Sequence, residues 1–199
     1  MSGGHRRSTR LPDYDYASAG AYFVTICAYG RQLLFDNPSL VAIAEDEWRA
    51  LPSRFANVKL DAFVVMPNHI HFVLWLDPVG APLAGALAGA EPVGAPLACA
   101  QGDSRAGASP APTLGTIVGA FKSRVATRWL IWLRANAPET PGRIWQRNYY
   151  ERVIRDEAEL TRVREYILSN PLQWHLDREN PERTPDSAYD REWGWLEAT

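Results

Sequence analysis

Along this chain the apolar positions follow first the period of a strand and then that of a helix. Residues 21–30 are mostly apolar, β-branched or aromatic, which predicts a strand. In the next segment Ser39 is a candidate N-cap, and an amphipathic helix is expected to end near Pro52. The apolar stripe of this helix consists of Leu40, Ile43, Ala44, Trp48 and Leu51.

Two short strands are predicted in the stretch VKLDAFVVMPNHIHFVLWL, residues 58–76. Pro67 has no backbone N–H to donate to a neighbouring strand. We therefore place a bend or a strand boundary at Pro67 and Asn68, between the two apolar runs.

The second half of the chain repeats the alternation between the two periods. Thr113 is a candidate cap for a long amphipathic helix, and residues 142–155 are strand-like, with arginines and aromatic residues interleaved. The apolar stripe of the helix is formed by Leu114, Ile117, Val118, Phe121, Val125, Trp129 and Trp132.

The last predicted helix begins at a capping-box-like pair, Asp156 and Glu159, and ends at Asn170-Pro171. The order of elements is thus strand, helix, two strands, helix, strand and helix. This order predicts an α+β fold, in which the helices pack on an antiparallel sheet.

The composition changes in residues 78–112, where Ala, Gly and Pro dominate and PVGAPLAGA is nearly repeated as PVGAPLACA. Such a segment has too few large side chains to offset the entropy lost on ordering. We interpret it as a flexible insertion within a single domain that spans residues 21–175.

The two ends of the chain are expected to lie outside this domain. Residues 1–20 are predicted to form a basic arm without the apolar core of a secretory signal. Residues 176–199 are predicted to be a polar tail, with Trp193 and Trp195 as candidate docking anchors.

Charge and cysteine content narrow the class of protein. The net charge of −2 gives no indication of a nucleic-acid partner, so any basic surface that binds one must be local. The sequence contains no apolar stretch of about 20 residues, so we expect no membrane partner. Cys27 and Cys99 form neither a CxxC motif nor a disulfide framework, which favours a reducing cytoplasm.

Several kinds of chemistry have no sequence motif here. The chain lacks G-x-x-x-x-G-K-[ST], G-x-G-x-x-G and G-x-S-x-G. These absences argue against ATP-driven, dinucleotide-dependent and α/β-hydrolase chemistry.

His69 and His71 are the most informative polar residues in an apolar strand. Alternation along a strand places both imidazoles on one face and Ile70 on the other, with the two Cα atoms about 6.5–7 Å apart. Imidazoles at this spacing can converge on one metal ion at about 2.1 Å each. They can equally form a polar strand face of hydrogen-bonded histidines, and no third ligand is evident from this motif alone.

Two other features also allow more than one interpretation. Tyr166 and Asn170 are four residues apart on one helical face, but Tyr166 can be an edge residue of the core and Asn170 a helix stop before proline. The arginine-aromatic segment, residues 142–155, can bind phosphates and stack on bases, or can be a strand with ordinary arginine–aromatic packing.

Three motifs in this order resemble those of the single-tyrosine transposases of the HUH endonuclease superfamily. The motifs are P-N-H-I-H at residues 67–71, W-Q-R-N-Y at residues 145–149 and Y-I-x-x-N-P at residues 166–171. More narrowly, the chain resembles the REP-associated tyrosine transposases of bacteria, over most of residues 6–174 apart from the insertion.

The resemblance implies a ferredoxin-like or palm-like sheet and a catalytic site. The two histidines, His69 and His71, would hold a divalent metal, Mg²⁺ or Mn²⁺, together with Asn170. Tyr166 would be the catalytic nucleophile, with Tyr149 and Tyr150 as competitors for that role. Such a ligand set carries no charge, so Mg²⁺ is expected to bind weakly until phosphate oxygens join it.

The resemblance also implies the substrate and the assembly. The partner would be single-stranded DNA with a hairpin structure, cut and rejoined through a 5′-phosphotyrosine intermediate by a homodimer in the cytoplasm, near the nucleoid. The alternatives are a catalytically silent nucleic-acid-binding regulator of the same fold and a metal-binding structural protein. The candidate DNA-contacting residues are Arg6, Arg7, Arg10, Lys122, Arg124, Arg143, Arg147, Tyr149, Tyr150 and Arg152.

Overall fold

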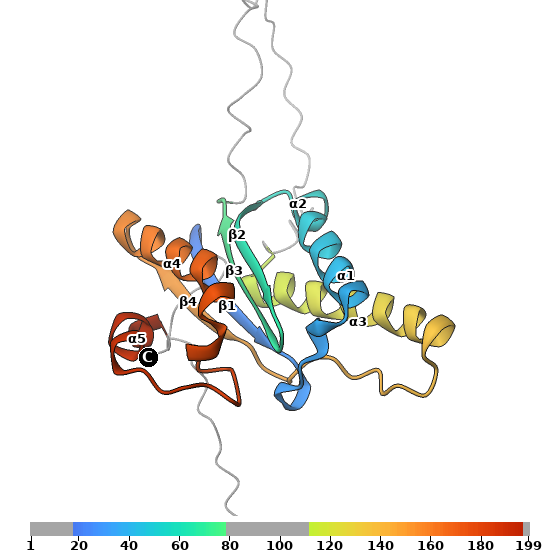
Figure 1. Cartoon of the computed structure of the whole chain (residues 1–199). Helices are drawn as coiled ribbons and strands as arrows, with labels where there is room; N and C mark the ends of the chain where they lie inside the picture. Colours follow the sequence, from blue (N-terminus) through green and yellow to red (C-terminus); the bar gives the residue numbers. More distant parts are fainter. Residues whose placement is uncertain (1–17, 79–111, 197–199) are drawn as a thin grey trace, which may run out of the picture.

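The structure is a computed structural model and describes residues 18–78 and 112–196. The central sheet has four strands in the order β2-β3-β1-β4 (Figure 1). The strands are β1 (Gly20–Cys27), β2 (Val58–Met66), β3 (His69–Leu76) and β4 (Tyr150–Ile154). Every neighbouring pair is antiparallel, so the predicted α+β, ferredoxin-like arrangement is confirmed.

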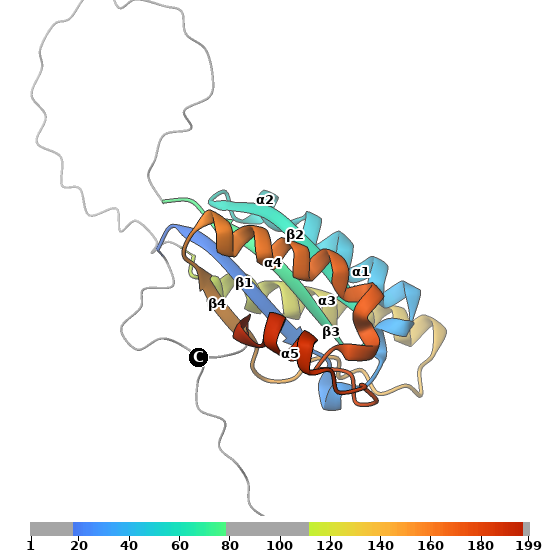
Figure 2. The same cartoon turned by 60° about the vertical axis from the view of Figure 1, so that its left-hand side comes forward.

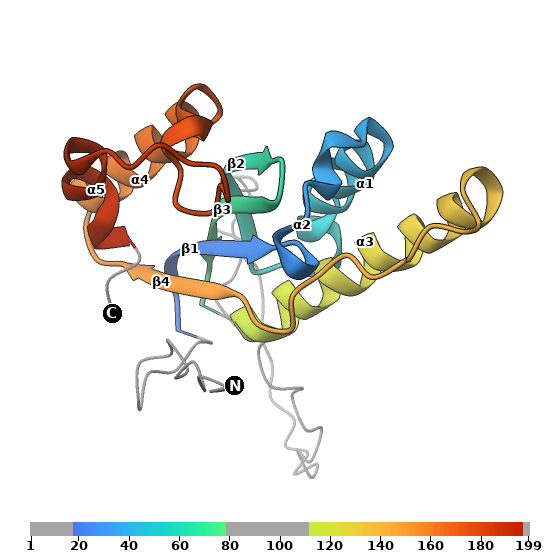
Figure 3. The same cartoon turned by 60° about the horizontal axis from the view of Figure 1, so that its bottom comes forward.

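Helices cover both faces of this sheet. On one face lie α1 (Pro38–Arg49), the short α2 (Leu51–Arg54) and α3 (Leu114–Asn136). On the other face lie α4 (Glu157–Ser169) and α5 (Ser187–Trp193). Figure 2 shows α4 in front of the strands with α1 and α3 behind, and Figure 3 shows the same layers from below.

Each face of the sheet buries its own apolar core. Ile70 and Phe72 of β3 pack in the core shared with α1 and α3. Val73 packs in the second core, with Leu160 and Val163 of α4. Because side chains alternate along a strand, the two histidines of β3 lie on the same face as Val73, under α4.

Several local predictions hold and one cap differs. The two-residue turn Pro67-Asn68 separates β2 from β3, as the missing proline donor predicts. The cap of α1 is Asn37 rather than Ser39: its side chain accepts a hydrogen bond from the Ser39 N–H at 3.0 Å. Pro38 fits the first turn because its missing N–H would have no helical partner there.

The other two long helices begin where the sequence predicts. The Thr113 side chain accepts from the backbone N–H of Thr116, and the Asp156 side chain accepts from that of Glu159. After Ser169 the chain does not leave the helical path but tightens into a 3₁₀ segment, η3 (Asn170–Leu176). A short η1 (Tyr29–Arg31), η2 (Leu34–Asp36) and η4 (Gly194–Leu196) complete the described elements.

The described part of the predicted polar tail is folded. Residues 176–196, called the C-terminal segment below, contain α5 and η4 and place Tyr189, Trp193 and Leu196 in the core beneath α4. Most of the predicted basic arm and of the alanine-rich insertion lies outside the described residues. Among the described helices, none is long and apolar enough to cross a membrane.

Candidate metal centre and tyrosine site

The two histidines of β3 meet under α4. Both are buried, and their Nε2 atoms lie 2.8 Å apart. The Cα partners of His69 and His71 on β1 are Cys27 and Thr25. Thr25 therefore stands on the same face as His71, since directly opposite residues of an antiparallel pair share a face. The prediction that both imidazoles share one face of the strand and Ile70 lies on the other is confirmed.

Each imidazole is held by a second residue through its other ring nitrogen. His69 Nδ1 lies 2.8 Å from Asn68 Oδ1, and His71 Nδ1 lies 2.8 Å from Thr25 Oγ1. Metal-binding histidines generally have such a partner on the nitrogen that does not face the metal, because it orients the ring. Sequence reasoning did not single out Asn68 or Thr25, although Asn68 belongs to the P-N-H-I-H motif.

Burial keeps both imidazoles neutral. It lowers the pKa of His71 to about 3. It also lowers the pKa of His69 well below its ordinary value, and the proximity of His71 and of the Arg31 guanidinium acts in the same direction. A neutral imidazole has a lone pair to offer, which is the form that binds a metal.

Tyr166 reaches the histidines from α4. Its hydroxyl lies 3.4 Å from His71 Nε2, and its ring packs edge-on against the imidazole of His71 and the ring of Phe23. On its other side the ring of Trp193 lies 5.3 Å away, measured between ring centroids. The side chain is thus held between the sheet and the C-terminal segment, and only 6% of Tyr166 is exposed.

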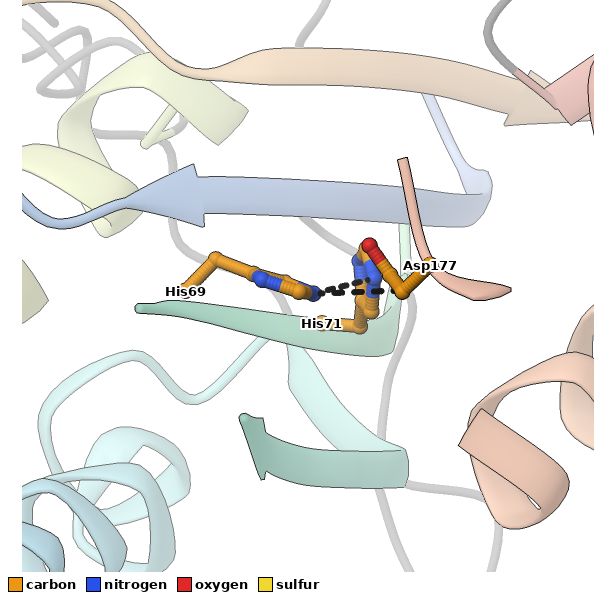
Figure 4. A group of neighbouring side chains, drawn as sticks. All are labelled: His69, His71 and Asp177. Carbon is orange, nitrogen blue, oxygen red and sulfur yellow. Dashed lines mark hydrogen bonds and ion pairs between the residues drawn. The ribbon is translucent and has the colours of Figure 1, made fainter. Parts of the chain in front are cut away.

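Asp177 joins the cluster from the C-terminal segment (Figure 4). Its Oδ2 lies 3.9 Å from His69 Nε2, and its Oδ1 accepts a hydrogen bond from the Glu179 N–H at 2.7 Å. Asp177 follows directly after η3 in a stretch that the sequence predicts to be a tail. Its only sequence signal is a lone aspartate near the motif Y-I-x-x-N-P, so sequence reasoning missed it.

Asn170, the predicted third ligand, opens η3 and is fully buried. Within residues 18–78 and 112–196, neither its Oδ1 nor its Nδ2 has a hydrogen-bond partner. A buried amide without partners is costly, and a bound ion or water is a common explanation. Its position one helical turn beyond Tyr166 keeps it a candidate ligand.

These residues fit a divalent cation. One donor atom each from His69, His71 and Asp177 lies within 4.8 Å of the other two. Two ligands at about 2.1 Å from one ion and at a right angle would be about 3 Å apart, close to the separation of the two Nε2 atoms. Asp177 also gives the set the negative charge that two imidazoles and an amide lack.

Some of the predicted DNA-contacting residues lie outside the described residues, and others bind to groups within the fold. Arg6, Arg7 and Arg10 lie outside the described residues. The Lys122 side chain is engaged within the fold. Its ammonium donates to the backbone oxygens of residues 146, 147 and 148, and burial lowers its pKa. Arg124 donates to the Glu47 carboxylate at 2.7 Å, which joins α3 to α1.

The arginine-aromatic segment is also engaged within the fold. Arg143 stacks on the ring of Tyr29, and Arg152 donates to Glu159 and to the backbone oxygen of Trp195. Tyr149 packs against the core shared with α1 and α3. Tyr150 donates to the backbone oxygen of Leu196. Arg147, like Arg143, is exposed and therefore accessible to a phosphate.

Comparison with known proteins identifies a relative of similar length. Over 182 residues it is 34% identical to an uncharacterized protein of Haemophilus influenzae, and the match covers 87% of this chain and 92% of the relative. The chain belongs to the family of that protein. No protein-family model matches it.

Two solved structures are similar in fold. One is a REP-associated tyrosine transposase bound to a REP hairpin, with a TM-score of 0.48, 16% identity, and coverage of 87% of this chain and 74% of that chain. The other is a candidate transposase from Deinococcus radiodurans, with a TM-score of 0.44, 16% identity, and coverage of 80% and 95%.

Proposed function

We propose that this protein is a metal-dependent endonuclease and strand transferase for single-stranded DNA, with Tyr166 as its nucleophile. One observation carries the proposal: the Tyr166 hydroxyl lies 3.4 Å from His71 Nε2, at a buried cluster of metal-ligating side chains. A tyrosine that served only the core would have no need of a hydroxyl that contacts a member of such a cluster.

The reaction is an exchange of phosphodiester partners. The Tyr166 oxygen forms a bond to a backbone phosphorus, and the bond from phosphorus to the 3′ oxygen breaks. The phenol gives up its proton and the leaving 3′ oxygen takes one up, so the products are a 5′-phosphotyrosine and a 3′-hydroxyl. The covalent link keeps the energy of the phosphodiester, so a 3′-hydroxyl can reverse the step without ATP.

The side chains around Tyr166 have separate tasks. At neutral pH only about a thousandth of a free phenol is ionised, since its pKa is about 10. A divalent metal, Mg²⁺ or Mn²⁺, on His69, His71 and Asp177, with Asn170 as a further candidate ligand, would neutralise charge on the scissile phosphate. Packing between Phe23, His71 and Trp193 holds the phenol at one position.

We propose hairpin-forming repeats as the substrate, in line with the motif resemblance. One structure of similar fold was solved with a REP hairpin bound, which makes that class of hairpin the first to try. Because Tyr166 is only 6% exposed and its ring packs against Trp193, we expect part of the C-terminal segment to move before a phosphate reaches the hydroxyl.

The test is a covalent adduct with labelled hairpin DNA in Mn²⁺ or Mg²⁺, resolved on a denaturing gel. We expect an adduct with the wild type and none with Tyr166→Phe. Tyr149→Phe is the matched control, because Tyr149 packs on the opposite face of the sheet and should leave the adduct intact. DNA binding without an adduct across several hairpins would instead support a catalytically silent regulator.

We also propose a homodimer, in which Tyr166 acts on its own chain's metal centre. The contact from Tyr166 to His71 within one chain supports this choice. Mixing Tyr166→Phe with His71→Ala protein tests it. Action within one chain predicts no adduct from the mixture, whereas an adduct restored by mixing would show action across the dimer.

A further inference from the structure

A chain of hydrogen bonds runs through the metal centre. The donor at one end determines where each of the other hydrogens in the chain lies. The chain of hydrogen bonds starts at the backbone oxygens of Arg31 and Glu179 and passes through Asn68, His69 and His71. It ends at the hydroxyl of Thr25. Each member has few ways to donate or accept, so fixing one end fixes the others.

The orientation of the Asn68 amide is decided by two carbonyls. Its Nδ2 lies 2.6 Å from the Glu179 oxygen and 3.4 Å from the Arg31 oxygen, and carbonyl oxygens can only accept. Oδ1 therefore faces His69 Nδ1, which must carry a hydrogen and donate it. In a neutral imidazole the other nitrogen is then bare, so His69 Nε2 presents a lone pair.

The next link assigns His71 the opposite tautomer. Two bare Nε2 atoms 2.8 Å apart would repel, so His71 Nε2 carries a hydrogen and donates it to His69. His71 Nδ1 is consequently bare and accepts from the Thr25 hydroxyl at 2.8 Å. Before a metal binds, the two histidines thus differ: His69 is protonated at Nδ1 and His71 at Nε2.

Metal binding requires both Nε2 atoms to be bare. His69 already meets this requirement, whereas His71 does not. The N–H bond at His71 Nε2 must break and one must form at Nδ1, with no net gain or loss of protons. Once Nδ1 carries a hydrogen, the Thr25 hydroxyl must turn from donor to acceptor, which a hydroxyl can do and an alkyl group cannot.

We infer that Thr25 is a positioning residue that allows His71 to change tautomer when the metal binds, while Asn68 holds His69 in the metal-binding tautomer throughout. The inference rests on the metal centre of the proposed function. It concerns the state of the side chains before DNA arrives, so binding of the metal alone can test it.

The first test uses nitrogen-15 NMR of the imidazoles in the full-length protein, because the shifts of Nδ1 and Nε2 distinguish the two tautomers. Without metal, His69 should be protonated at Nδ1 and His71 at Nε2. Addition of Zn²⁺ alone, a diamagnetic probe suited to imidazole, should move the hydrogen of His71 to Nδ1 and leave that of His69 in place. A metal-free His71 protonated at Nδ1 would overturn the inference.

The second test compares Thr25→Val with Thr25→Ser. Valine keeps the shape of threonine but has no hydroxyl, and serine keeps the hydroxyl. We expect Thr25→Val to bind Zn²⁺ about 10–100-fold more weakly, as is typical when a partner of a metal-bound histidine is lost, and Thr25→Ser to bind as the wild type does. Unchanged affinity in a folded Thr25→Val protein would contradict the role of Thr25. If Thr25→Val does not fold, the nitrogen-15 spectra of the wild type with and without Zn²⁺ still test whether His71 changes tautomer.

Failure of this inference and failure of the proposed function can be told apart. Tyr166→Phe should form no adduct yet keep the wild-type Zn²⁺ affinity and both tautomers. A wild-type protein that shows the tautomer change but never forms an adduct would overturn only the proposed endonuclease activity.

Discussion

On strand β3, Ile70 and Phe72 enter the core between the sheet and the helices α1 and α3, whereas His69 and His71 enter the space under α4. The first core is mainly apolar, and the buried Glu47 carboxylate at its edge pairs with the half-exposed Arg124 and Arg128, which joins α1 to α3. The second side buries imidazoles, an amide and a carboxylate among its apolar residues.

The difference shows how one sheet can separate stability from chemistry. Apolar side chains stabilise in proportion to the area that they bury, without demanding partners. Buried polar groups need a hydrogen bond for each donor and acceptor, or a ligand. Substitutions on the two faces should therefore have different consequences.

The largest loss of stability should come from Phe72→Ala. Removing this fully buried ring should lower the free energy of unfolding by about 3–5 kcal/mol, because it leaves a cavity between β3 and α3. His71→Ala, one residue away on the other face, should lower it by about 1–2 kcal/mol while abolishing metal binding. Urea denaturation and Zn²⁺ titration of both variants measure the contrast. A greater loss of unfolding free energy in His71→Ala than in Phe72→Ala would contradict this separation of stability and metal binding between the two faces.

A change confined to metal affinity is expected from Asp177→Asn. The amide keeps the oxygen that accepts from the Glu179 N–H but removes the charge beside His69. Affinity for Mn²⁺ without DNA should fall about 10-fold or more, measured by calorimetry. Asp190→Asn is the control, since Asp190 lies in the same C-terminal segment but pairs with Arg178 and Arg183. Equal affinities in the two variants would exclude Asp177 as a ligand.

The charged rim of the opposite face should contribute less. The Glu47 carboxylate is buried and bonds to Arg124 and Arg128. Glu47→Gln should therefore lower the free energy of unfolding by about 1–2 kcal/mol without altering Zn²⁺ affinity. Glu45→Gln provides the comparison, because Glu45 forms an exposed pair with Arg49 that is worth about 0.5 kcal/mol or less.

The smallest expected effect is a dependence of stability on acid pH. Hydrogen bonds from Arg164 of α4 hold the pKa of Asp61 on β2 below its ordinary value of 3.8. A lowered pKa means that this contribution is fully present above pH 3.8 and is lost as the pH falls through the folded-state pKa. Thermal unfolding between pH 2 and 5 should show a shallower acid dependence in Asp61→Asn. An unchanged slope would mean that this pair does not help hold α4 to the sheet.

Local patterns in the sequence were sufficient for most of the elements and for the orientation of the histidines, although the strand predicted over residues 142–155 covers only Tyr150–Ile154. Thr113 and Asp156 cap the helices that they were predicted to cap, and the Pro67-Asn68 turn separates the two strands as expected. The alternation His69-Ile70-His71 determines which side chains share a face. These features depend on neighbours within a few residues, so the order of residues is enough to predict them.

The residues that complete the site depend on contacts between distant segments. Asp177 reaches His69 only because η3 continues α4 and turns the C-terminal segment back over the sheet. Thr25 stands beside His71 because of the register between β1 and β3, forty-six positions apart in the chain. The ammonium of Lys122, a candidate DNA contact, donates to three backbone oxygens that only the folded chain brings together.

Local patterns were enough to predict the α+β order of elements, the pair of imidazoles on one strand face, and a tyrosine one helical turn before Asn170. The tertiary structure was needed to show that these groups meet, that the Asp177 carboxylate lies beside His69, and that Asn68 and Thr25 contact the Nδ1 atoms of the two imidazoles. The difference lies in how far along the chain the interacting residues are from one another. Periodicity and capping act along a few residues of backbone, whereas a metal centre is a convergence of side chains whose distances are set by sheet register and by the path of the chain after α4.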